Sequence, residues 1–322
     1  MEHFHRGGGA VNLARTVSGQ MSMMVGPQAP PVEHPLREIT NDILATARAA
    51  QGQLNGAKPG TAIHELRVAL KRWQALLRLL EDSIGDEAVV LRHEARLLAR
   101  DFGRSRDAQT VLDALADIAK PREAETPPLS ERTEVTLTRR LQQARAASEA
   151  TQTHSVAIQH LHDGLARASA CAANWPLERI SLEDVIAALA RSYRRARRRL
   201  PREWEGADAE AIHDFRKAVV AFRYQLDLIA PLWPKVWHAF IDEVQKVRMQ
   251  LGKSNDLVAL RMLTQPKQPL AHWRSRLTPP IENRRRFHLG RARALSGRVF
   301  AESPRSFRKR IAALAKAAAD SA

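Results

Sequence analysis

The sequence predicts an all-α protein built from two antiparallel helical bundles. Glycine (15 of 322 residues), tyrosine (2) and phenylalanine (8) are sparse, while alanine, leucine and arginine are abundant, which favours helix over sheet. Apolar residues recur at helical spacing, and no stretch alternates cleanly like a half-buried strand. The chain also matches itself when it is shifted by 149 residues. This match predicts a tandem duplication whose two bundles are related by a pseudo-two-fold axis.

The self-match begins at a His-x-x-Arg motif. The stretch "AIHELRVALKRW" matches "AIHDFRKAVVAF", so that His64 pairs with His213 and Arg67 with Arg216. The register continues downstream without a gap for some fifty residues. Such a match is unlikely by chance, and each copy would occupy roughly half of the chain.

A second shared motif follows each histidine at the same distance. "FGRSRD" matches "LGKSND", which pairs Gly103 with Gly252 and Asp107 with Asp256. We expect the glycines to end helices in a positive-φ conformation. We expect the aspartates to cap the next helix or to hold a nearby arginine.

The pattern divides the chain into four segments. They are a disordered N-terminal segment at 1–32, a first helical-bundle repeat at 33–173, a second repeat at 176–316, and a frayed tail at 317–322. The N-terminal segment is rich in glycine, methionine and proline, and it lacks the contiguous apolar core of a secretory signal. Each repeat offers about five helical segments. A Pro-rich loop interrupts each repeat, "PREAETPPLSER" in the first and "QPKQPLAHWRSRLTPP" in the second.

The charge of the chain points to an anionic partner. The formal net charge is +16, and it is unevenly distributed: residues 1–170 hold 21 basic and 20 acidic side chains, whereas residues 171–322 hold 30 and 15. Arginine supplies 41 of the 51 cations, and its planar guanidinium suits bidentate contact with phosphate. That much self-repulsion favours a bound polyanion.

Composition also indicates where the protein resides. No run of about 18 apolar residues occurs, so we expect no membrane span and no membrane partner. The single cysteine, Cys171, excludes a disulfide framework and suits a reducing compartment. We therefore expect a cytoplasmic protein.

Basic side chains form stripes on three predicted helices. At about 100° per residue, His64, Arg67, Lys71 and Arg78 share one side of the first motif helix, and His213, Arg216 and Arg223 repeat this stripe with Lys217 on its flank. On the helix before the second motif, one face carries Arg191, Arg194, Arg195, Arg198 and Arg202. Most charge runs are solvated faces. These stripes, however, stack like charges four apart without acidic partners, which is unfavourable unless an anion lies there.

These motifs resemble the CHAD domain, the conserved-histidine α-helical domain. The resemblance rests on "IHELRVALKRW", "IHDFRKAVVAFRY", "LLARDFGRSRDA", "QLGKSNDLVAL" and "SYRRARRRL", and it extends from Glu33 to the final basic helix. It implies two four-helix bundles around a basic channel that binds inorganic polyphosphate. It also implies association with polyphosphate granules and their proteins.

The resemblance and the stripes together give a set of candidate binding residues. The family pattern implies polyphosphate contacts at His64, Arg67, Lys71, Arg72, Arg194, His213, Arg216 and Arg223. The stripes add Arg78, Arg191, Arg195, Arg198 and Lys217, and the C-terminal helices add Arg285, Arg293, Arg305 and Arg308. Gln74, Val220 and Ala221 depart from the family pattern, because basic residues are usual there. Arg195, Arg198 and Arg286, together with these four C-terminal arginines, would compensate for them.

The two motif histidines leave three interpretations open. Each ring donates a hydrogen bond to phosphate, or fixes a neighbouring helix, or binds a metal or carries a phosphoryl group. The metal interpretation is weak, because no other His, Cys or carboxylate lies at ligand spacing on the same stripe. We therefore expect no metal site and no cofactor.

Catalysis is not expected, and nucleic acid is the alternative ligand. Phosphoryl transfer needs carboxylates that hold magnesium, and no such set or phosphate-binding Gly-Lys-Ser/Thr loop occurs. DNA or RNA phosphates would also be drawn to the stripes. The sequence lacks a helix-turn-helix, a zinc finger or an RNA-recognition aromatic pair, however, so inorganic polyphosphate is the ligand we predict.

Overall fold

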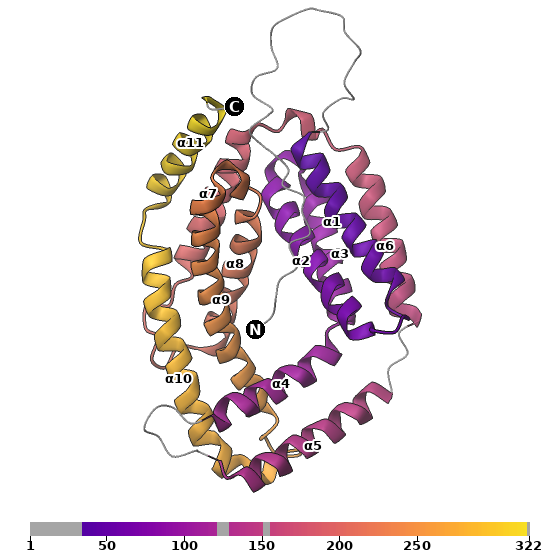
Figure 1. Ribbon diagram of the computed structural model, residues 1–322, viewed down its shortest axis with the longest axis vertical. Coiled ribbons are helices and arrows are strands. Elements are labelled where there is room, and N and C mark those ends of the chain that lie inside the picture. The colour runs from indigo at the N-terminus through magenta and orange to yellow at the C-terminus, as the bar shows by residue number, and fades with distance from the viewer. Residues whose placement is uncertain (1–33, 121–128, 151–154, 321–322) are drawn as a thin grey trace, which may run out of the picture.

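The protein is all-helical in the part of the chain that the structure describes. The computed structural model describes residues 34–120, 129–150 and 155–320. Within these ranges there are eleven α-helices, three short 3-10 helices and no strand (Figure 1). The predicted all-α class is thereby confirmed. The expected disorder of residues 1–32 and most of the first Pro-rich loop lie outside the described residues.

The helices follow the same order in the two halves of the chain. In the first half they are α1 (Pro35–Gly52), α2 (Pro59–Ile84), α3 (Asp86–Asp101), α4 (Arg104–Ala119), α5 (Glu131–Ala150) and α6 (Ser155–Ala173). In the second they are α7 (Leu182–Arg198), α8 (Ala209–Leu226), α9 (Pro234–Met262), α10 (Arg274–Val299) and α11 (Pro304–Asp320). The ends of α5 and α10 lie 149 positions apart, as do the starts of α6 and α11. Equal spacing of helix ends is what a tandem duplication predicts.

One difference between the halves is that α3 and α4 correspond to the single helix α9. The chain breaks between α3 and α4 at Gly103, whereas Gly252 lies inside α9. The positive φ that we predicted is wrong for Gly103, which has φ −83°, and Gly252 does not end a helix. The second-copy aspartate, Asp256, also lies within α9 and therefore caps no helix.

Gly103 instead gives room to the motif arginine Arg67. A Cβ placed on Gly103 would lie 3.2 Å from Nη1 of Arg67 and 2.9 Å from the Arg100 carbonyl oxygen. A Cβ on Gly252 would lie 3.9 Å from Nε of Arg216, an ordinary van der Waals distance, so Arg216 does not require glycine there. Glycine at the first position therefore lets a guanidinium approach the backbone closely.

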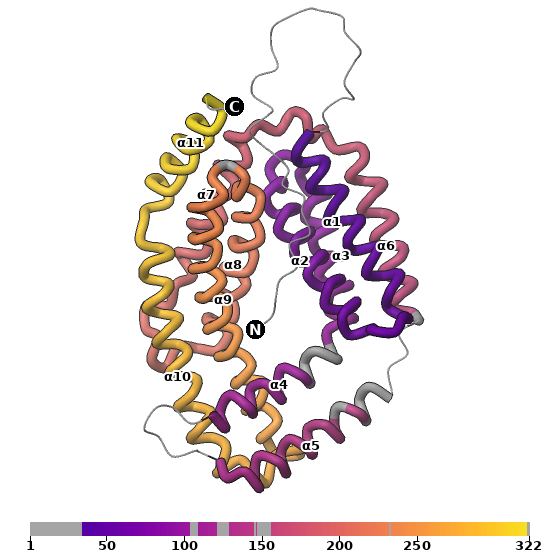
Figure 2. The backbone as a smooth tube through the Cα atoms, viewed as in Figure 1, coloured from indigo at the N-terminus to yellow at the C-terminus, as the bar shows by residue number. Residues whose placement is uncertain are grey.

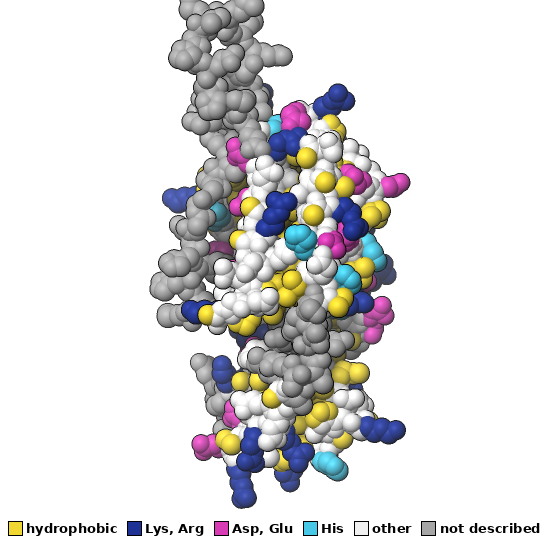
Figure 3. Space-filling view, turned by 90° about the vertical axis from the view of Figure 1, so that its right-hand side faces the viewer, with side chains coloured by type: hydrophobic (Ala, Val, Ile, Leu, Met, Phe, Trp, Pro, Cys, Tyr) yellow, Lys and Arg dark blue, Asp and Glu magenta, His cyan; other side chains and the backbone are white. Residues whose placement is uncertain are grey.

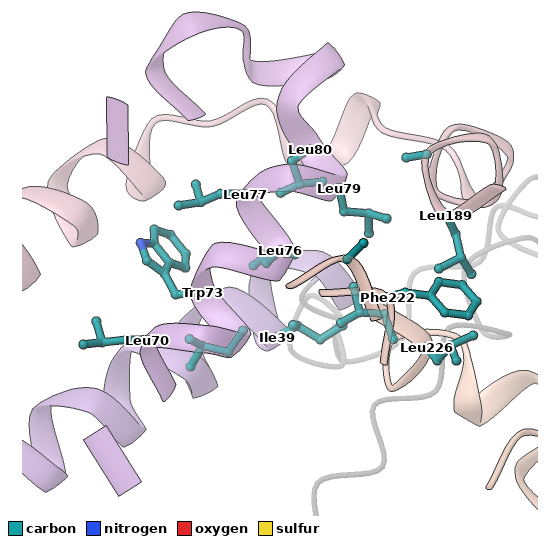
Figure 4. Close-up of a cluster of buried hydrophobic side chains, with 14 of the residues drawn as sticks. Ile39, Leu70, Trp73, Leu76, Leu77, Leu79, Leu80, Leu189, Phe222 and Leu226 are labelled. Carbon is teal, nitrogen blue, oxygen red and sulfur yellow. The ribbon is translucent and has the colours of Figure 1, made fainter. Parts of the chain in front are cut away.

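One apolar core joins the two halves. Trp73 on α2 stacks on Trp175 at 5.5 Å, and Leu79 of α2 lies on the side of Phe222 and Leu226 of α8 (Figure 4). The side chain of Gln225, which is fully buried, donates to the Ala75 carbonyl oxygen at 3.0 Å across this interface. Because both copies bury side chains in the same core, we expect them to fold as one unit.

A second core lies where α4 and α5 meet the ends of α9 and α10 (Figure 2). Its members come from both halves of the chain: Val111, Leu115, Ile118, Leu137, Leu141, Leu257, Leu260, Leu277 and Ile281. The α4–α5 segment thus packs on helices of the second half as well as on itself. Helices α1, α2, α3 and α6 of the first repeat pack against one another in a ring, and the α4–α5 segment lies outside it.

Two segment boundaries differ from the sequence prediction. The second Pro-rich stretch is partly helical, because α10 begins at Arg274 and includes Pro279 and Pro280. Burial of Leu277 and Ile281 in the second core stabilises this helical start. At the other end, α11 continues to Asp320, into the tail that we expected to fray. Alanine, the best helix former, dominates its last turns.

None of the described helices is long and apolar enough to cross a membrane.

Candidate functional site

A basic cavity of about 630 Å³ lies between the two halves of the molecule. Its lining side chains come from α2, α3, α8 and α9, together with Arg199, which follows α7. They are Lys71, Gln74, Ala75, Arg78, Arg92, Arg96, Arg100, Arg199, His213, Asp214, Arg216, Lys217, Ala218, Val220, Ala221 and Arg248. Both copies thus contribute cations to one shared space.

The charged side chains of the lining are almost all cationic. It contains nine lysine and arginine side chains but a single carboxylate, Asp214, which pairs with Lys217 at 2.5 Å. The face of the molecule in Figure 3 is different, because acidic, basic and apolar side chains are interspersed over its upper part. Charge segregation of this kind raises the local concentration of anions.

Arg78 shows that the cavity disfavours the charge of its own cations. Burial, together with the nearby cations Arg195 and Arg92, lowers the pKa of Arg78 to about 10. Burial also lowers the pKa of Arg195. Glu81 partly offsets the repulsion by pairing with Arg92 and by attracting Arg78 and Arg195. A bound anion would relieve what remains.

His213 is the motif histidine that lines the cavity. Its Nδ1 lies 3.2 Å from Oδ1 of Asn255 on α9. Because that oxygen only accepts, Nδ1 donates, and Nε2 can then donate to a ligand only when the ring is protonated. His64, its counterpart in the first copy, does not line the cavity.

The structure brings five of the predicted binding residues together in the cavity: Lys71, Arg78, His213, Arg216 and Lys217. Arg195 lies beside them, close enough to repel Arg78 and Arg92. Arg194 and Arg198 are exposed on α7 and do not line the cavity.

Arg67 has a different place from the one that the motif suggested. Its Nη1 donates to the Ala99 carbonyl oxygen at 2.6 Å, near the C-terminal end of α3. A cation at a helix C-terminus satisfies a carbonyl and is favoured by the helix dipole. Arg67 therefore ties α2 to α3 and does not line the cavity, whereas the equivalent Arg216 does.

Three further predicted cations are neutralised within the chain. Nη2 of Arg72 contacts the Asp42 carboxylate on α1 at 2.9 Å, and Arg191 pairs with Asp82. Arg223 lies 3.2 Å from Asp227, one turn later on the chain. Each of the three arginines is already paired with a carboxylate and is absent from the cavity lining.

The C-terminal arginines also lie away from the cavity. Arg285 donates to the Ala207 carbonyl oxygen at 3.3 Å and so holds the loop before α8, and Arg308 pairs with Glu183 at 3.2 Å. Arg293 and Arg305 are exposed on α10 and α11. None of these four side chains lines the cavity. The positive charge that Gln74, Val220 and Ala221 do not provide therefore has to come from other residues.

Those other residues lie mainly on α3. Arg92, Arg96 and Arg100 line the cavity, and Arg199 and Arg248 complete it, although none of the five was predicted as a contact. The α3 arginines are spaced four apart in the sequence, and this spacing was the signal that could have identified them. They supply positive charge where Gln74 and Val220 have replaced basic residues in the lining.

Comparison with known proteins agrees with this architecture. The CHAD domain family model matches residues 38–265. This chain belongs to the CHAD domain family. The crystal structure of the CHAD domain from the plant Ricinus communis has 19% sequence identity to it and a TM-score of 0.53, with 86% of this chain and 90% of that chain covered. At this identity the likeness shows a shared fold. No curated protein matches the sequence.

Proposed function

We propose that the protein binds inorganic polyphosphate in the basic cavity between its two halves. The observation that carries this proposal is the convergence of nine lysine and arginine side chains from both copies around one space, with a single carboxylate among them. The lowered pKa of Arg78 supports it, since buried cations that repel one another are stabilised by a bound anion. Membership of the CHAD domain family agrees with the proposal.

The composition of the lining favours a polymer of phosphates over nucleic acid. None of the lining residues is a tryptophan, tyrosine or phenylalanine. Single-stranded nucleic acid gains much of its binding energy by stacking its bases on aromatic rings. A chain of phosphates without bases needs only closely spaced cations, and those are present.

The proposal includes binding without catalysis. Phosphoryl transfer would need carboxylates to hold magnesium, and the one carboxylate in the lining is paired with Lys217. No group of three or more metal-ligating side chains occurs among the described residues. Since granules consist of the same polymer, we also propose that the protein associates with polyphosphate granules in the cytoplasm.

Calorimetric titration tests the proposal with three probes: long-chain polyphosphate, orthophosphate and a mixed-sequence oligonucleotide. We expect tight binding of the polymer and weak binding of the other two. The cavity variant Arg96→Glu with Lys217→Glu should reduce polymer affinity by about a hundredfold or more, because two charge-assisted contacts become repulsive. Equal affinity for oligonucleotide and polyphosphate would overturn the proposal.

A matched control separates the cavity from the overall charge. The variant Arg139→Glu with Arg140→Glu changes the net charge by the same amount, but on the exposed surface of α5. We expect this control to bind long-chain polyphosphate nearly as well as the parent protein does. If both variants lose affinity equally, net charge and not the cavity determines binding.

A further inference from the structure

The outward face of α10 is a second strongly basic surface, separate from the cavity. Helix α10 packs against α9 and lies at the outer edge of the molecule (Figure 1). Its inward face buries His288, Leu289, Ala292 and Ser296. The opposite face is exposed, and between Asn283 and Val299 the helix contains no acidic residue.

The exposed arginines of α10 form two rows. Arg286 and Arg293 lie on one flank of the outward face, and Arg291 and Arg298 lie on the other, with seven positions between the members of each row. A seven-residue step corresponds to about 10 Å along a helix. Of the four, only Arg298 has a carboxylate near it among the described residues, at 3.5 Å from Glu243. Because these like charges stand in rows and only one of them has a nearby carboxylate, a linear anion lying alongside them would be favourable.

The strip between the two rows has no bulky side chain. It contains Gly290, Ala294 and Gly297, all of them exposed. A Cβ added to either glycine would meet nothing within 4 Å, so no neighbour in this chain requires glycine there. A strand of phosphates lying along this strip would have guanidinium groups on both sides.

We propose that this outer face of α10, defined by Arg286, Arg291, Arg293 and Arg298, binds segments of polyphosphate chains that extend beyond the cavity. The inference rests on the proposed function. A cavity of about 630 Å³ holds only a short part of a long polymer, and the remainder stays tethered to the protein. A second contact with a tethered chain is intramolecular, and it raises the overall affinity without changing the first site.

The chemistry of this face favours polyphosphate over the other polyanions. An anionic membrane would need an apolar face to insert, but the exposed residues after Asn283 are arginine, glycine and alanine. Bases would need aromatic rings, and the one aromatic side chain nearby, Phe287, is half-buried with the Arg291 guanidinium 5.7 Å from its ring centre.

The test compares short and long chains in the full-length protein. The outer-face variant Arg286→Glu with Arg291→Glu is titrated with tripolyphosphate and with long-chain polyphosphate. We expect unchanged affinity for tripolyphosphate and about a tenfold or larger loss for the long chain. The control Arg139→Glu with Arg140→Glu should change neither. The cavity variant Arg96→Glu with Lys217→Glu should lose both.

Each alternative outcome has a distinct meaning. If the outer-face variant binds long chains as well as the α5 control does, the outer surface has no role and the inference is wrong. It is equally wrong if that variant loses affinity for an oligonucleotide or for anionic phosphatidylserine vesicles but keeps its affinity for long-chain polyphosphate. If the proposed function itself is wrong, a different result is expected: the cavity variant would then bind tripolyphosphate as well as the parent protein does.

Discussion

Arg78 is a cavity residue whose charged form the fold disfavours. Burial and two neighbouring cations hold its pKa at about 10, well below the usual value for arginine. A side chain that the fold disfavours in its charged form has to be explained by something other than stability. The proposed binding of an anion in the cavity is such an explanation.

This interpretation predicts the behaviour of Arg78→Gln. Removing the charge relieves repulsion with Arg92 and Arg195, so the unfolding temperature of the ligand-free variant should be equal to or higher than that of the parent protein. Its affinity for polyphosphate should fall by about tenfold to a hundredfold, the usual range for one charge-assisted contact. Thermal unfolding and calorimetry measure the two quantities. A less stable variant with normal affinity would show that Arg78 is structural.

His213 leads to a prediction that separates the interpretations left open by the sequence. With Nδ1 engaged by Asn255, the ring donates to phosphate from Nε2 only in its protonated form. We therefore expect His213→Gln to lower polyphosphate affinity by about tenfold without lowering the unfolding temperature, as calorimetry and thermal unfolding would measure. If the variant instead loses stability and keeps its affinity, the histidine is structural.

At the residue scale the sequence predicted the cavity only in part. Helical periodicity identified Lys71, Arg78 and Arg216 correctly as lying on polar helix faces. Periodicity did not show which cations on these faces line the cavity and which face solvent or pair with a carboxylate. Tertiary packing decides between these positions. Arg72 was predicted as a contact and pairs with Asp42, while Arg96 was missed although it lines the cavity.

At the scale of elements, hydrogen bonds of one histidine fix α4 to the second half of the chain. Nε2 of His288 on α10 lies 2.7 Å from Asp117 on α4, and its Nδ1 lies 2.7 Å from Oε1 of Gln250 on α9. Burial is the largest single influence on the pKa of Asp117 and raises it. The hydrogen bond to His288 and the nearby groups His288, Lys253 and Arg284 together outweigh burial, so the net pKa is lowered.

The lowered pKa of Asp117 predicts how stability depends on pH. A carboxyl with a lower pKa in the folded protein contributes stability above about pH 3.8, its unfolded value, and loses that contribution as the pH falls through the folded value. At pH 6 we expect Asp117→Asn to lower the free energy of unfolding by roughly 1–3 kcal/mol. The difference from the parent protein should shrink below pH 4. Urea unfolding at several pH values measures it, and a constant difference down to pH 2 would contradict the assignment.

Helix identities were easier to predict than helix partners. Apolar spacing gave the all-α class, and the 149-residue match anticipated the repeated order of helices. The packing of α4 and α5 against α9 and α10 was not predicted, because it depends on the break at Gly103, which redirects the chain. In the sequence alone, a glycine that gives room to an arginine cannot be told apart from a glycine that ends a helix with a positive φ.

At the scale of the whole molecule, the formal charge of +16 and the convergence of cations on one cavity predict that the proposed binding depends strongly on salt. Each phosphate contact releases condensed counterions, and the affinity for a single-stranded polyanion falls with a log–log slope of about −0.7 per contact. If about eight of the nine lining cations contact phosphate, affinity should fall by roughly three orders of magnitude between 50 and 200 mM salt. Titration with long-chain polyphosphate across this range gives the slope.

The cavity variant should lower the magnitude of this slope by about 1.4 and the outer-face variant by a similar amount, since each removes two contacts. A slope near −1 would mean that one or two cations carry the binding, which is incompatible with a polymer held along the whole cavity.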